Sequence, residues 1–92
     1  MSDAKPLDGK VALVTGASGG IGRATVDLLT RRGARVVAED IHDGVLSMAS
    51  DLVAPIKGDV RKSQTAASAV ELALTRFGRL DIMVANAGIG VM

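Results

Sequence analysis

The sequence predicts an α/β fold, in which a parallel sheet carries helices on both of its faces. Short apolar runs alternate with longer segments of helical spacing along the chain. The apolar runs are hydrophobic at consecutive positions, which is typical of strands buried on both faces. Parallel strands need a crossover between them, so we expect the order β-α-β-α-β-α-β.

The first strand is expected at residues 11–14 and the first helix at residues 21–32, after a polar lead-in at residues 1–9. The later elements are expected as strand 35–39, short helix 45–52, strand 54–57, helix 64–77 with Ser63 as its N-cap, and strand 82–85. The first three strands step outward and the fourth returns beside the first, which gives the strand order 3-2-1-4.

Each long helix is expected to bury one apolar stripe. In the first helix the stripe is Ile21, Ala24, Leu28 and Leu29. In the second helix it is Ala66, Val70, Ala73, Leu74 and Phe77.

Composition narrows the classes of function. The 92 residues carry a formal net charge of +1, so we expect no surface for nucleic acid or membrane. The sequence contains no cysteine and a single histidine, His42, which we place in a solvated loop, so no metal site is predicted. The polar first residues lack the apolar segment of a secretory signal, and we expect a cytoplasmic protein.

A glycine-rich turn joins the first strand to the first helix. Gly16, Gly20 and Gly22 follow the strand at once. Glycine has no Cβ, so the backbone can turn sharply and approach a ligand closely. The helix that follows points free N–H groups with a partial positive charge at the turn. The pattern predicts a Rossmann-type diphosphate site, and the alternative is an ordinary strand-to-helix turn.

The run T-G-A-S-G-G-I-G, from Thr15 to Gly22, resembles the TGxxxGxG motif of the short-chain dehydrogenase/reductase family. Its glycine spacing resembles that of the non-extended members. Asp40, the run 58–60 (G-D-V) and the run 86–88 (N-A-G) stand in the order of the family's further landmarks. The resemblance implies the amino-terminal part of an NAD(P)-binding Rossmann domain over residues 1–92.

The resemblance also implies a set of residues that contact a dinucleotide cofactor. They are Gly16, Ser18, Gly20, Ile21, Gly22, Asp40, Asp59, Val60, Asn86, Ala87 and Gly88.

Asp40 follows Gly22 by 18 residues, close to the spacing expected of the acid that accepts the adenosine ribose hydroxyls. A carboxylate there repels a 2′-phosphate, so we expect NAD in preference to NADP. The neighbouring Glu39 is a weaker candidate, because successive strand residues point to opposite faces. The alternative for Asp40 is a solvated loop residue or a cap.

The two later landmarks carry their own alternatives. By the resemblance, Asp59 accepts the adenine amine and Val60 covers the ring, whereas a turn or cap carboxylate is the alternative. Asn86, Ala87 and Gly88 are expected on the nicotinamide side of the crevice. Asn86 could equally bridge backbone groups.

The family's catalysis relies on a serine and a Tyr-x-x-x-Lys pair that lie beyond this region, and the chain contains no tyrosine. We therefore expect the cofactor-binding half of an oxidoreductase that interconverts an alcohol and a ketone, truncated and not catalytically competent alone. The alternative is a non-catalytic nucleotide-binding or interaction fragment. The fourth strand is expected to leave an unpaired edge, so self-association through it is predicted.

Overall fold

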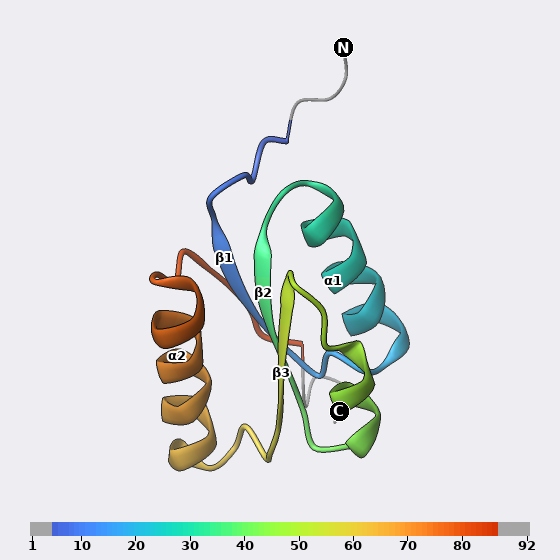
Figure 1. Ribbon diagram of the computed structural model, residues 1–92. Helices are drawn as coiled ribbons and strands as arrows, with labels where there is room; N and C mark the ends of the chain where they lie inside the picture. Colours follow the sequence, from blue (N-terminus) through green and yellow to red (C-terminus); the bar gives the residue numbers. More distant parts are fainter. Residues whose placement is uncertain (1–4, 87–92) are drawn as a thin grey trace.

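The computed structural model describes residues 5–86, which form a parallel four-stranded sheet between two helical layers (Figure 1). The elements in chain order are β1 (Val11–Thr15), α1 (Gly20–Arg31), β2 (Arg35–Asp40), the 3-10 helix η1 (Asp43–Met48), β3 (Val53–Lys57), α2 (Ser63–Phe77) and β4 (Ile82–Val84). Across the sheet the order is β3-β2-β1-β4 with every pair parallel. The predicted fold class and strand order are confirmed.

The strands are buried on both faces because helices cover both sides of the sheet. Figure 1 shows α1 and η1 on one side and α2 on the other. All five residues of β1 are buried, as the continuous apolar run predicts. The core on the α1 side consists of Ala12, Val14, Ala17, Val26, Val36, Ala38, Val45 and Val53. The core on the α2 side consists of Val11, Leu13, Val37, Ala54, Ala69 and Ala73.

The predicted buried stripe of α1 is wrong, because the face that the helix buries is displaced from it by about one residue. The helix faces the sheet through Gly22 and Val26, with Leu29 partly buried, whereas Ile21 is 76% exposed and Leu28 is 42% exposed. The physical reason is that Gly22 forms part of the packed face. Glycine adds nothing to an apolar pattern, so the pattern alone selects the neighbouring stripe.

The predicted buried stripe of α2 is wrong in part. Ala69 and Ala73 face the sheet, whereas Val70 and Leu74 are exposed. Small side chains on this face let the helix lie close to the strands.

The predicted N-cap at Ser63 is also wrong. Lys62 is the N-cap, and its side chain makes no capping bond. The helix starts one residue earlier than predicted, directly after a turn that the Lys62 N–H closes by donating to the Asp59 carbonyl oxygen at 2.9 Å. The stop at Gly78 is confirmed, since the Gly78 N–H donates to the carbonyl oxygens of Ala73 and Leu74.

The predicted short helix 45–52 is a 3-10 helix that begins and ends earlier, at Asp43–Met48. Its end is set by Ser50, whose Oγ accepts hydrogen bonds from the N–H groups of Leu52 at 3.1 Å and Val53 at 3.2 Å. This local turn competes with helical hydrogen bonding and starts β3.

Two hydrogen bonds join the residue that precedes β4 to the first residue of β1. The Asp81 N–H donates to the Val11 carbonyl oxygen at 2.8 Å, and the Val11 N–H donates to Asp81 Oδ2 at 2.9 Å. Arg79 lies against the same carboxylate, with Nη2 2.8 Å from Oδ1. The Arg79 side chain and then the Val11 N–H hold the pKa of Asp81 below its usual value. These contacts fix the register that places the end of β4 beside the end of β1.

No helix within residues 5–86 has both the length and the apolar character needed to cross a lipid bilayer.

Substitution of Gly22 by alanine should destabilise the fold. A Cβ there would overlap the Gly16 carbonyl oxygen and lie 2.8 Å from its carbonyl carbon. We expect the free energy of unfolding in urea to fall by about 1–3 kcal/mol. Gly20→Ala is the matched control, because a Cβ at Gly20 meets nothing within 4 Å. Equal stability of the two variants would contradict the close approach.

Candidate functional site

The glycine-rich turn lies at the carboxyl end of β1 and passes directly into α1. Gly16 has a φ of +66°, a left-handed conformation that favours glycine. Gly19 is the N-cap of α1, no side chain caps the helix, and its first turn carries no acidic residue. A Cβ at Gly20 would stand in open space. The turn therefore combines N–H groups at a helix terminus with room beside them, an arrangement suited to an anion.

Asp40 and Ser18 meet at this turn. Asp40 is the last residue of β2 and is only 6% exposed. Its Oδ2 accepts hydrogen bonds from Ser18 Oγ at 2.7 Å and from the Ser18 N–H at 2.9 Å. Its Oδ1 accepts from the His42 N–H at 3.1 Å. The carboxylate is thus fixed against the glycine turn and is not a freely solvated loop residue, which disfavours that alternative.

Two opposing effects set the ionisation of Asp40. Burial alone would raise its pKa, but hydrogen bonds from the Ser18 hydroxyl and from the backbone N–H groups of Ser18, His42 and Ile41 outweigh it and hold the pKa below the usual value. Asp40 is therefore ionised at neutral pH. It presents a negative charge beside the turn.

Asp59 lies in the loop between β3 and α2 and is bound by Arg61. Arg61 Nη2 donates to Asp59 Oδ2 at 2.7 Å and Arg61 Nε donates to Oδ1 at 3.0 Å. The Arg61 side chain, followed by its backbone N–H, lowers the pKa of Asp59 to about 2. The preceding Gly58 N–H donates to the Asp40 carbonyl oxygen at 2.9 Å, so this loop adjoins the end of β2. Val60 is partly buried in the same loop.

Asn86 joins the end of β4 to the glycine turn. Its backbone N–H donates to Thr15 Oγ1 at 2.9 Å, and its Nδ2 donates to the Gly16 carbonyl oxygen at 3.2 Å. Asn86 therefore ties the end of β4 to one side-chain oxygen and one backbone carbonyl at the end of β1. Ala87 and Gly88 lie outside the described residues.

Glu39 is the residue that sequence reasoning undervalued. It is 1% exposed, and within residues 5–86 its Oε1 is a buried oxygen without a hydrogen-bond partner. Burial is the main cause that raises its pKa. The burial of Glu39 could be predicted from the sequence. Consecutive strand residues point to opposite faces, so a strand that is buried on both faces must bury both of two consecutive acids, one on each face.

The structure therefore gathers most of the predicted site at the carboxyl ends of the strands. Ser18 bonds to Asp40, Asn86 bonds to the Gly16 carbonyl oxygen, and Asp59 lies in the adjoining loop. The Ile21 side chain is exposed to solvent beside the turn.

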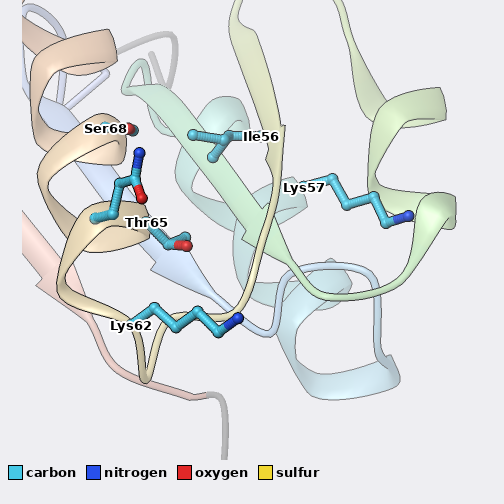
Figure 2. Close-up of a pocket in the computed structure, with 6 residues that line it drawn as sticks. Ile56, Lys57, Lys62, Thr65 and Ser68 are labelled. Carbon is cyan, nitrogen blue, oxygen red and sulfur yellow. The ribbon is translucent and has the colours of Figure 1, made fainter.

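A separate hollow of about 230 Å³ lies between the end of β3 and the start of α2 (Figure 2). No predicted site residue lines it; its lining is Ile56, Lys57, Lys62, Gln64, Thr65 and Ser68. Figure 2 shows the Lys57 side chain directed away from α2, and its Nζ lies 2.6 Å from Asp43 Oδ1. Lys57 is therefore paired with an acid of η1 and not with a predicted site residue. Among residues 5–86, no group of three His, Cys, Asp or Glu could hold a metal ion.

The sequence profile described as short chain dehydrogenase matches residues 10–92. The chain belongs to the short-chain dehydrogenase family. A 41% identical relative is an uncharacterized oxidoreductase of Mycobacterium tuberculosis, aligned over 96% of this chain and 39% of the relative. Momilactone A synthase of Oryza sativa subsp. japonica is 42% identical over 96% of this chain and 34% of that enzyme.

Solved short-chain dehydrogenase structures show the same fold. A 3-ketoacyl-(acyl-carrier-protein) reductase from Brucella melitensis, complexed with NADH, superposes with a TM-score of 0.79 and is 37% identical. The match covers 84% of this chain and 34% of the reductase. The chain thus spans between a third and two fifths of the length of these short-chain dehydrogenase relatives.

Loss of the Ser18 hydroxyl should raise the pKa of Asp40. In Ser18→Ala the carboxylate loses a 2.7 Å hydrogen bond, so the free energy of unfolding at neutral pH should fall by about 1.5–3 kcal/mol. A depressed pKa stabilises the fold above the unfolded pKa, and this contribution is lost as pH falls through the folded pKa. The difference between variant and wild type should therefore shrink on acidification, as followed by urea unfolding and carboxyl NMR.

The matched control is Ser47→Ala. Ser47 Oγ donates only to the Gly44 carbonyl oxygen, on an exposed turn. An unchanged Asp40 pKa in Ser18→Ala, or an equal change in Ser47→Ala, would show that the Ser18 hydroxyl does not hold the carboxylate ionised.

Proposed function

We propose that this chain binds a nicotinamide dinucleotide at its glycine turn and prefers NAD to NADP. The observation that carries the proposal is the Asp40 carboxylate, fixed by Ser18 beside the uncapped start of α1. The family membership and the NADH complex of the similar Brucella melitensis reductase support it.

The residues present fit the diphosphate of such a cofactor. The N–H groups at the start of α1 favour an anion, and the open space at Gly20 leaves room for it. Gly22 allows the helix to start close to Gly16. Ser18 joins this turn to Asp40 and so couples the diphosphate position to that of the adjoining ribose.

The remaining contacts follow from the positions of the strand ends. We assign the ribose hydroxyls to Asp40 and the adenine to Asp59 and Val60, where the amine must share the Asp59 carboxylate with Arg61. Asn86, Ala87 and Gly88 are assigned to the nicotinamide side. When bound, the nicotinamide ring supplies the hydride acceptor or donor.

The activity proposed for the whole protein is the interconversion of an alcohol and a ketone. This chain supplies the dinucleotide-binding half, and with no tyrosine in its sequence it should not be catalytically competent alone. A non-catalytic nucleotide-binding or interaction role is the alternative. A cytoplasmic location stays a prediction of the sequence.

Calorimetric titration should show NAD binding more tightly than NADP. Asp40 is ionised and repels a 2′-phosphate, while it accepts hydrogen bonds from ribose hydroxyls. Asp40→Asn should weaken NAD binding by about ten- to a hundredfold, the equivalent of one lost hydrogen bond to a charged group. The relative affinity for NADP should rise.

Asp43→Asn is the control, because Asp43 is an exposed neighbour paired with Lys57. Its NAD affinity should match the wild type. Preference of the wild type for NADP would refute the role of Asp40, and no binding of either dinucleotide would refute the site.

The outer edge of β4 should pair with a second copy of this chain. Within the described residues β4 bonds only to β1, and Met83 at its centre is 59% exposed. An apolar strand edge without a partner promotes pairing between molecules. Sedimentation should show species larger than a monomer, and Met83→Lys should shift them toward the monomer. A stable wild-type monomer would contradict this prediction.

A further inference from the structure

Glu39 keeps a carboxyl group in the core with one of its two oxygens unpartnered among the described residues. It lies in β2, one of the two central strands, and is 1% exposed. Its Oε1 accepts no hydrogen bond from any described residue. An unsatisfied buried polar atom costs about 1–3 kcal/mol, more if it is charged. The folded protein therefore either bears this free-energy cost or keeps the Glu39 carboxyl uncharged.

Glu39 lies directly behind the glycine turn. In the sheet register it stands between Thr15 of β1 and Ile56 of β3. The Gly16 N–H favours its ionised form, so the carboxyl adjoins the first glycine of the turn. The Glu39 carbonyl oxygen also accepts from the Ala17 N–H at 2.9 Å, which fastens the turn to β2.

The electrostatic surroundings of Glu39 favour its protonated form. Burial raises its pKa most, and the carboxylates of Asp40 and Asp59 raise it further, against the Gly16 N–H. Asp40 lies on its own strand and on the opposite face, and Asp59 follows β3. Of the cations in this region, Arg61 pairs with Asp59 and Lys57 pairs with Asp43, while Lys62 also acts on Asp59 from the start of α2.

We propose that Glu39 is a positioning residue of the dinucleotide site, which holds an uncharged carboxyl against Gly16 while the dinucleotide is bound and weakens binding when it loses its proton. An ionised Glu39 would place a third negative charge near Asp40 and Asp59, behind the turn that receives an anionic diphosphate. The proton released passes to solvent. This inference rests on the proposed dinucleotide function of the same turn.

The first test follows the Glu39 proton itself. The sequence contains only two glutamates, Glu39 and Glu71, so carbon-13 NMR of the glutamate side-chain carboxyls gives two signals to assign. The Glu39 signal should titrate above the ordinary glutamate range, and saturating NAD should move that titration to still higher pH. Titration of Glu39 in the ordinary range, or no response to NAD, would overturn the inference.

The second test measures NAD affinity by calorimetry across the pH range in which the NMR titration shows Glu39 to lose its proton. The affinity should fall with rising pH, by up to about tenfold per pH unit above the pKa of Glu39. Glu39→Gln carries no titrating proton, so its affinity should stay flat and near the wild-type value at the acidic end. A merely structural role would not flatten the profile.

Glu71→Gln is the matched control, because it makes the same chemical change on an exposed face of α2. It should keep the wild-type pH dependence. A pH-dependent fall that persists in Glu39→Gln would overturn the inference while the dinucleotide site stands, whereas no NAD binding at any pH would refute the proposed function itself. If Glu39→Gln does not fold, the NMR titration of the wild type decides.

Discussion

Helix α1 packs its backbone at Gly22 against the carbonyl group of Gly16, at a distance that only glycine allows. The start of the helix is thereby held at the end of β1, with its first turn uncapped by any side chain. The same turn is fastened to β2 through the Ala17 N–H and to β4 through Asn86. A short backbone contact thus brings three strand ends to one helix terminus that no side chain caps.

Two consecutive acids at the end of β2 meet opposite environments because strand residues alternate between faces. Asp40 is met by N–H and hydroxyl donors, and these overcome burial and keep its pKa low. Glu39 turns into the α2 side, where burial dominates and its pKa rises. The pKa values of two neighbouring acids are thus moved in opposite directions at one strand end.

The sequence predicted the strands, their order and the glycine turn because each depends on local pattern: apolar runs, glycine spacing and strand-end acids. It failed on which face each helix buries. Gly22 in α1 and the alanines of α2 are small, so they give weak apolar signals although they make the closest contacts with the sheet. Close packing favours a small side chain where the helix contacts the sheet. An apolar pattern in the sequence is instead recognised from its large side chains.

The candidate site also has features that the sequence predicts and features that it does not. Spacing placed Asp40 at the turn, but its bond to the Ser18 hydroxyl depends on tertiary geometry that no local pattern encodes. The buried carboxyl of Glu39 could be deduced, because a central strand of a doubly covered sheet has no solvent face. Where such a strand ends in two acids, one of them must enter each helical layer. Asp40 finds several donors on its face, whereas Glu39 keeps one carboxyl oxygen without a hydrogen-bond partner among the described residues.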